Sequence, residues 1–167
     1  MPDRSAAYRF GGFTLFLAAA VILTALGFQY LGGLAPCPLC LMQRYAYYAA
    51  IPLLFVAMAL VAEMPRLAAV LFAVVALAFL ANAGLGVYHA GVEWKLWAGP
   101  DTCGTMQTLS TSAADLLKRL ETTIVPRCDE AAWTFLGLSM AGWNAVVSLA
   151  AFLGALKAAT LAAASAE

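Results

Sequence analysis

The chain has 167 residues, of which 64% are hydrophobic and 11% carry a formal charge, and its nine basic side chains balance nine acidic ones. A soluble domain carries about 25% charged residues, so the composition excludes a water-soluble globule and a disordered chain. The lack of a basic excess excludes a nucleic-acid-binding protein. Ten of the 18 charges lie between Glu93 and Glu130. We therefore predict a single integral membrane domain, residues 1–167, with one long polar loop.

The stretches between the charges define the candidate membrane spans. A helix needs about 20 apolar residues to cross the hydrocarbon core, and an open sheet edge cannot be satisfied in lipid. The sequence therefore predicts an all-α membrane protein, a bundle of four transmembrane helices. The predicted spans are residues 11–31, 42–62, 67–88 and 132–156.

Four spans place both termini on one side of the membrane and the connections at 32–44 and 89–131 on the other. Basic residues are denser on the side of the termini, which favours cytoplasmic termini. In the longer connection, apolar residues at helical spacing between Leu109 and Leu120 predict a short amphipathic helix on the membrane surface, or a cover packed on the bundle. The two connections contain all four cysteines: Cys37, Cys40, Cys103 and Cys128.

The cysteine pattern favours two disulfides over free thiols or a metal site. Free cysteines would be scattered through the apolar spans, and a zinc site would need a second tight pair or more histidines than His89. A Cys103–Cys128 bridge closes about 25 residues, as structural disulfides do. A Cys37–Cys40 bridge closes almost none and stabilises little, and this Cys-x-x-Cys spacing is typical of redox-active dithiols. The sequence therefore predicts thiol–disulfide exchange at the membrane surface, with no metal.

The residues after the Cys-x-x-Cys motif suggest where the electrons go. If the second span begins near Cys40, this thiol lies at a helix N-terminus, which favours the thiolate. Arg44 lies one turn further along, where it can stabilise the thiolate and an anionic acceptor, or extend to the lipid headgroups. The sequence has no nucleotide-binding fingerprint, so a lipid-soluble quinone is the acceptor that fits best.

Further side chains are candidates for lining a quinone site. His89 suits either this site or an interfacial position bonded to headgroups, and the tyrosines and tryptophans also suit an interfacial aromatic belt. The candidates are Arg44, Tyr47 or Tyr48, His89 and Met140, and the tryptophans expected in the belt are Trp94, Trp97 and Trp133.

Two motifs resemble the DsbB family of bacterial inner-membrane disulfide oxidases. The first is Cys37-Pro38-Leu39-Cys40 followed by Gln43-Arg44, and the second is the segment CDEAAWTFLGLSM from Cys128 to Met140. The resemblance extends from the first span to the end of the fourth. It implies a four-helix bundle in the bacterial inner membrane, with cytoplasmic termini and periplasmic cysteine loops.

The resemblance also implies an activity. The protein would reoxidise a DsbA-like periplasmic thioredoxin-fold protein and pass the electrons to ubiquinone or menaquinone. Cys103 would form the mixed disulfide with the partner, and Cys37–Cys40 would reoxidise the Cys103–Cys128 pair. Arg44 and Met140 match positions at the family's quinone site, and His89 lies near a similarly placed histidine. The family often has an acidic residue before the arginine, where this chain has Gln43.

Three other functions remain open at this stage. A membrane oxidoreductase of the vitamin K epoxide reductase type also pairs loop cysteines with a Cys-x-x-Cys motif, but there the tight pair follows the loop pair. A second is a branch of the DsbB family dedicated to one substrate. The third is a tetraspan scaffold or transporter, for which the spans offer only Asn82 and Asn144 as strongly polar interior residues.

Overall fold

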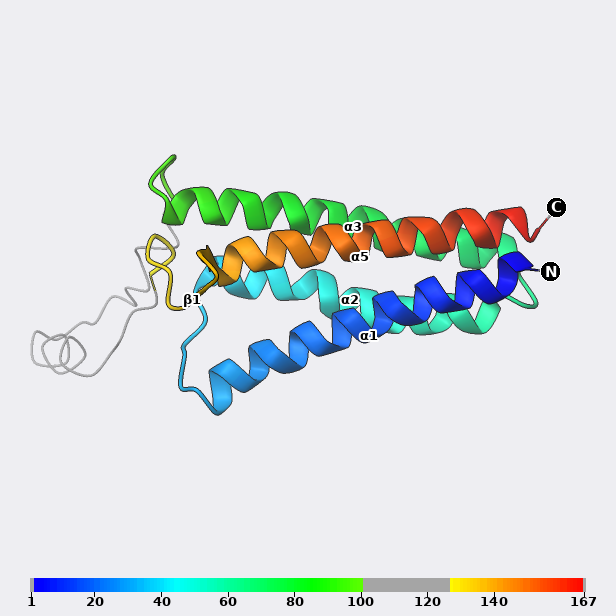
Figure 1. Cartoon of the computed structure of the whole chain (residues 1–167), viewed down its shortest axis with the longest axis horizontal. Coiled ribbons are helices and arrows are strands. Elements are labelled where there is room, and N and C mark those ends of the chain that lie inside the picture. Colours follow the sequence, from blue (N-terminus) through cyan, green and yellow to red (C-terminus); the bar gives the residue numbers. More distant parts are fainter. Residues whose placement is uncertain (1, 101–126, 167) are drawn as a thin grey trace, which may run out of the picture.

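A computed structural model describes residues 2–100 and 127–166, and its four long helices run side by side (Figure 1). All four are long and apolar enough to cross a membrane, which confirms the predicted four-helix membrane fold. The amphipathic helix predicted between Leu109 and Leu120 lies outside the described residues. The helices are α1 (Pro2–Tyr30), α2 (Pro38–Leu60), α3 (Pro65–Glu93) and α5 (Met140–Ala164).

Local signals determine where three of these helices begin. Pro38 and Pro65 occupy the first turn of α2 and α3, where the N–H that proline lacks would have no partner within the helix. Ser139 caps α5, because its Oγ accepts the N–H of Gly142 at 3.1 Å. The starts of α2 and α5 lie at the end of the bundle that holds the Cys-x-x-Cys motif, called the cysteine end below, whereas α3 starts at the end with the termini (Figure 1).

The fourth helix lies further along the chain than predicted. A span from residue 132 to 156 is wrong, because a hairpin of β1 (Thr134–Phe135) and β2 (Leu138–Ser139) precedes the helix. The hairpin turn contains Gly137 with φ of +80°, a conformation that glycine adopts without steric cost. The hairpin is as apolar as a helix would be, so hydropathy alone did not distinguish them.

The third helix also extends beyond its predicted end. It continues to Glu93, so residues 89–93 are helical and do not belong to the predicted 89–131 connection. In the sequence, Glu93 is the first charge of the polar region, whereas in the structure its side chain is only 7% exposed. His89 and Glu93 are therefore held on a helix, one turn apart.

Small residues let α5 pack closely on its neighbours. Its buried alanines recur every three or four residues, and small side chains allow helix backbones to approach closely in lipid. Near the cysteine end, α3 faces α5 with a glycine. A Cβ at Gly86 would lie 2.9 Å from the backbone nitrogen of Ala145, so the two helices are in close contact there. The fully buried alanines of α5 are Ala151, Ala155, Ala158 and Ala162.

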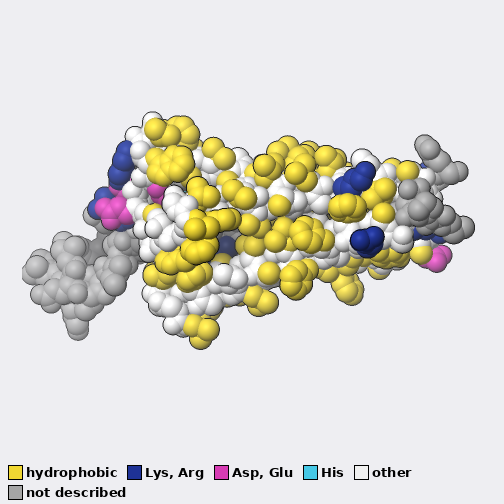
Figure 2. All heavy atoms as spheres, in the orientation of Figure 1, with side chains coloured by type: hydrophobic (Ala, Val, Ile, Leu, Met, Phe, Trp, Pro, Cys, Tyr) yellow, Lys and Arg dark blue, Asp and Glu magenta, His cyan; other side chains and the backbone are white. Residues whose placement is uncertain are grey.

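The first helix is packed differently from the other three. It lies against the bundle near the termini and diverges from it toward the cysteine end (Figure 1). Both termini lie at one end of the bundle, as predicted from the number of spans. Hydrophobic side chains cover the length of the bundle, and the charged ones gather toward its ends (Figure 2).

A polar network joins α2, α3 and α5 in the interior. The Tyr47 hydroxyl donates to Asn144 Oδ1 at 2.8 Å and lies 2.9 Å from Ser148 Oγ. Asn82 Nδ2 donates to Ser148 Oγ at 3.0 Å. Buried polar groups need such partners, above all where lipid offers none. The two asparagines singled out in the sequence therefore link helices to one another.

Candidate functional site

The Cys-x-x-Cys motif forms the first turn of α2. Cys37 and Cys40 are joined by a disulfide, with their Cα atoms 5.0 Å apart. Cys37 is the N-cap residue, and its Sγ accepts the backbone N–H of Cys40 at 3.1 Å. The expectation that Cys40 lies at a helix N-terminus is thus confirmed. Cys37 is 3% exposed, whereas Cys40 is only partly buried.

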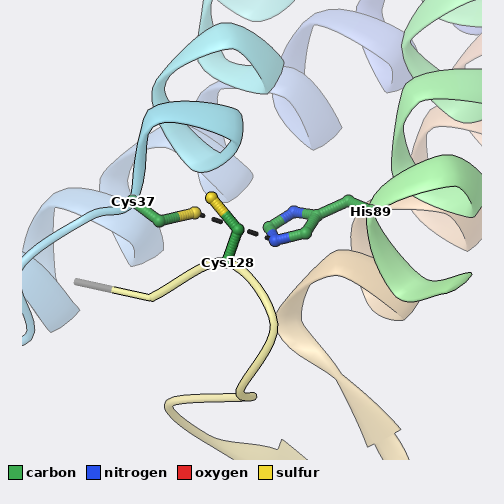
Figure 3. Close-up of side chains that lie close together, drawn as sticks. All are labelled: Cys37, His89 and Cys128. Carbon is green, nitrogen blue, oxygen red and sulfur yellow. Dashed lines mark hydrogen bonds between the residues drawn. The ribbon is translucent and has the colours of Figure 1, made fainter. Parts of the chain in front are cut away.

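Three segments meet at Cys37. His89 reaches it from α3, and Cys128 reaches it from the segment before the hairpin (Figure 3). One ligand atom of each residue, either sulfur or a ring nitrogen of His89, lies within 4.8 Å of the others. Cys128 is itself disulfide-bonded, and Cys103, the predicted partner, lies outside the described residues. The fold therefore brings a sulfur of the second pair next to the tight pair.

Gln43 fixes the orientation of the His89 ring. Its Nε2 donates to His89 Nδ1 at 2.9 Å, so the proton of the neutral ring lies on Nε2. That nitrogen faces Cys37 Sγ at 3.7 Å. His89 is 2% exposed, which excludes the alternative of an interfacial histidine bonded to headgroups. The histidine is therefore a buried neighbour of the Cys37 sulfur.

The same trio has the ligand types of a zinc site. Two cysteine sulfurs and an imidazole within 4.8 Å of one another resemble part of a Cys/His metal centre. Zinc binds the thiolate, however, and both sulfurs here are in disulfides. The arrangement is therefore described better as a meeting of two disulfides beside a histidine.

Ion pairs hold the segment of Cys128 against the end of α3. Lys95 Nζ lies 2.6 Å from Asp129 Oδ2, and Arg127 donates to both carboxylate oxygens of Asp129 at 3.0 Å. Hydrogen bonds from Arg127 and then Lys95 hold the pKa of Asp129 well below its usual range, and Asp129 raises the pKa of Arg127. These contacts flank Cys128 in sequence and help to position it.

A cavity of about 980 Å³ borders the Cys37–Cys40 disulfide where α1 diverges from the bundle. Its size is at the upper end of the range of small-molecule sites. Arg44, His89 and Met140, the three residues predicted to bind the acceptor, all line it. Tyr47 lines it as well, whereas Tyr48 is 44% exposed.

Aromatic rings form one wall of the cavity. Trp133 was expected in an interfacial belt, but it lines the cavity, and its ring centroid lies 5.2 Å from that of Phe28 in α1. Trp133 also stacks on Phe135 of β1 at 5.7 Å. Trp143 of α5 completes the row and donates its indole N–H to the carbonyl of Phe135 at 3.0 Å. The wall therefore combines α1, the hairpin and α5.

Arg44 connects α2 to α1 across this cavity. Its guanidinium donates to Gln29 Oε1 at 2.5 Å and to the carbonyl of Ala25 at 3.3 Å. The side chain is directed to a neighbouring helix, not to the headgroups, so the alternative of an extended lipid anchor does not describe it. Because a guanidinium has five N–H donors, these two bonds leave others for a ligand.

Two polar atoms at the cavity were not anticipated from the sequence. Among the described residues, the buried side-chain atoms without a hydrogen-bond partner are Glu93 Oε2 and Asn144 Nδ2, and both residues line the cavity. Such atoms are costly unless something binds them. Asn144 was noticed only as an interior polar residue, and Glu93 only as a loop charge.

Comparisons with known proteins agree with this site. The model of the family "Disulfide bond formation protein DsbB" matches residues 8–158. A disulfide bond formation protein B from Xanthomonas oryzae is 33% identical over 149 residues, covering 86% of this chain and 85% of the relative. One from Azoarcus sp. is 35% identical, covering 85% and 89%. One from Methylococcus capsulatus is 35% identical, covering 75% and 77%.

No solved structure matches the chain. The family match spans all four helices and both motifs that carried the resemblance. The chain belongs to the DsbB family of disulfide-forming membrane oxidoreductases.

Proposed function

We propose that this protein oxidises a periplasmic thioredoxin-fold dithiol protein of the DsbA type and passes the electrons to a membrane quinone, ubiquinone or menaquinone. The observation that supports the proposal is that three features lie together. They are the Cys37–Cys40 disulfide, the sulfur of Cys128 beside Cys37, and the cavity between the helices that the disulfide borders.

The exchange between the two pairs follows from the position of Cys128. When the partner reduces the Cys103–Cys128 disulfide, the Cys128 thiolate attacks Cys37 Sγ, and Cys40 leaves as a thiolate. Cys103 then attacks Cys128, which re-forms the loop disulfide and releases the Cys37 thiolate. Both steps are thiolate attacks on a disulfide, so electrons and protons balance without another reactant. The closeness of Cys37 and Cys128 supports the first attack.

The N-terminus of α2 suits the thiolate that leaves. Cys40 lies in the first helical turn, where the helix dipole favours negative charge. His89 Nε2 faces Cys37 Sγ and can donate a hydrogen bond to the thiolate formed there. The helix N-terminus would thus stabilise the Cys40 thiolate, and His89 would stabilise the Cys37 thiolate.

The residues of the cavity fit a quinone. A quinone ring has two carbonyl oxygens that accept hydrogen bonds, and it takes up two electrons and two protons when bound. Arg44 and the unpartnered Asn144 Nδ2 are donors that would hold those oxygens, and Met140 and the aromatic wall would contact the ring. The cavity lies between helices that face lipid, which suits an acceptor with an apolar tail.

The same proposal fixes the orientation in the membrane. The Cys37–Cys40 disulfide at the start of α2 lies at the end of the bundle opposite the termini (Figure 1). Disulfides persist on the oxidising side of the bacterial inner membrane. We therefore place the cysteine end in the periplasm and both termini in the cytoplasm, where the denser basic residues agree with the positive-inside rule.

The test is turnover by the purified full-length protein in detergent. A reduced DsbA-type protein is supplied with and without a short-chain ubiquinone, and both partner thiols and quinone absorbance are followed. We expect one quinone reduced for each disulfide formed in the partner. Partner oxidation at the same rate without quinone would contradict the proposed acceptor, and quinone reduction by small thiols but not by the partner would contradict the proposed substrate.

A further inference from the structure

Glu93 is a buried carboxyl group whose place in the site is unexplained by disulfide exchange. It is the last residue of α3, its side chain is 7% exposed, and it lines the same cavity as the Cys37–Cys40 disulfide. Its Oε2 is buried and has no hydrogen-bond partner within the part of the chain that the structure describes. Buried polar atoms almost always have a partner, so an unpaired one in a residue that lines a cavity points to a role toward a ligand there.

The contacts of Glu93 hold its carboxyl group in place. Oε1 lies 4.0 Å from His89 Nε2, one helical turn earlier. Ser139, the residue that caps α5, lies beside the carboxyl group. His89 in turn faces Cys37 Sγ. The carboxyl group therefore lies where α3 meets the start of α5, and His89 lies between it and the sulfur.

The other charged residues of the cavity are placed differently. Glu130 has a 64% exposed side chain and pairs with Arg127 at 3.2 Å. Arg44 is bonded to α1, and no ion pair joins it to Glu93 among the described contacts. A buried carboxylate is costly without a paired cation, whereas the carboxylic acid is an O–H donor. Glu93 is thus the acidic group at the cavity that is suited to give a proton to a ligand.

We propose that Glu93 is the proton donor to the quinone oxygen in this cavity, an inference that rests on the proposed function. Oxidation of the Cys37–Cys40 dithiol to the disulfide releases two electrons and two protons, and the quinone takes up two of each. Glu93 gives one proton from Oε2 and becomes a carboxylate. It regains a proton from those released by the thiols, and the second proton of the quinol comes from the adjacent solution.

The test compares Glu93→Gln with an amide control in full-length protein in detergent. Glu63→Gln changes an exposed carboxyl group in the turn between α2 and α3, outside the cavity. General acid catalysis contributes about 10²- to 10⁴-fold, so we expect kcat for short-chain ubiquinone to fall about 100-fold in Glu93→Gln. KM for the quinone should stay within about threefold, and the control should match the wild type.

A second readout does not depend on turnover. Infrared difference spectra, recorded as the same quinone is added to oxidised protein, should show a shift in the C=O band of a protonated carboxyl. We expect the shift in the wild type and in Glu63→Gln, and not in Glu93→Gln. Glu93→Asp keeps a carboxylic acid and serves as a second variant if Glu93→Gln fails to fold. It should retain the C=O band shift and a higher kcat than Glu93→Gln.

The outcomes separate this inference from the function it rests on. Wild-type protein that reduces quinone, together with Glu93→Gln within twofold of its kcat, would overturn the role of Glu93 alone. A wild-type spectrum with no carboxyl shift would also overturn it, as would a band shift retained in Glu93→Gln. Failure of the wild type to reduce quinone would overturn both proposals.

Discussion

The two ends of the bundle are made from the same four helices but are packed in opposite ways. Toward the termini, α5 meets its neighbours through fully buried alanines such as Ala155 and Ala158. Toward the cysteines, α1 diverges, and the space between it and α2 is bordered by Arg44 and by the rings of Phe28 and Trp133. Small side chains bring helices together, while large and charged ones keep them apart.

This difference separates a closely packed part of the bundle from the part that holds the disulfide and the cavity. The end near the termini, the closed end, is packed through small buried side chains, and the end with the cavity is the open end. The open end places polar groups at a cavity where they are only partly satisfied, as Asn144 is. Substitutions at the open end should therefore change chemistry, and substitutions at the closed end should change stability.

The largest effect is expected at the sulfur between the two cysteine pairs. Replacement of Cys37 by serine removes the atom that Cys128 is proposed to attack, so partner oxidation should be abolished. The helices should remain folded, because a serine hydroxyl can also cap α2. Quinone-linked oxidation of a DsbA-type protein and circular dichroism would measure the two effects. Turnover above a few percent of wild type would show that Cys128 transfers its electrons by another route.

A smaller effect is expected at the charged side chain that spans the cavity. Hydrogen bonds to charged groups contribute about 1.5–3 kcal/mol, so Arg44→Met should raise KM for short-chain ubiquinone about tenfold or more. Thiol trapping should still find the Cys37–Cys40 disulfide. Arg66→Met, which replaces an exposed arginine in the first turn of α3 at the other end, is the matched control. Equal KM values for the two variants would limit Arg44 to joining α1 and α2.

At the closed end, the expected effect is on stability alone. Ala158 is fully buried, and Ala158→Leu adds side-chain volume where the helices are in contact. Overpacking of this kind costs about 1–3 kcal/mol. The unfolding temperature in detergent should fall, while KM for the quinone stays within about twofold. If KM rose as much as in Arg44→Met, the two ends would be mechanically coupled.

The smallest effect is expected at the ion pairs beside Cys128. Because the folded pKa of Asp129 is depressed below its usual 3.8, its contribution to stability is present above that value and is lost as pH falls through the folded pKa. The Asp129 carboxylate should therefore stay ionised in acid well below pH 3.8. An NMR titration of carboxyl-labelled protein would measure this. In Lys95→Ala the pKa of Asp129 should rise part of the way toward its usual value. An unchanged pKa would assign the whole lowering to Arg127.

Much of the fold could be predicted because lipid imposes a simple constraint on sequence. Charge-free stretches of sufficient length revealed four helices, and the even number placed the termini together. The residues at which the helices begin and end were harder to predict. The hairpin at 134–139 is apolar and depends on a glycine with positive φ, and Glu93 is a charge that the fold buries. Hydropathy does not register either feature.

The site was predictable in its residues and less so in their contacts. Cys37, Cys40, Arg44, His89 and Met140 were found from motifs and resemblance, and all border one cavity. The partner of Arg44 in α1 and the bond between Gln43 and His89 join residues 15 and 46 positions apart. Such contacts depend on how the helices pack. The unpaired oxygen of Glu93 emerged only from the three-dimensional arrangement.

The N-cap of α2 has a consequence for the proposed catalytic cycle. Cys37 Sγ accepts the N–H of Cys40, so the sulfur that would change partners in this cycle also caps the first turn of a membrane helix. A thiolate is a stronger acceptor than a disulfide sulfur, because its bond to an N–H is assisted by charge. Opening of the disulfide should therefore tighten the start of α2. The first turn of α2 should therefore stay folded both when the Cys37–Cys40 pair is oxidised and when it is reduced.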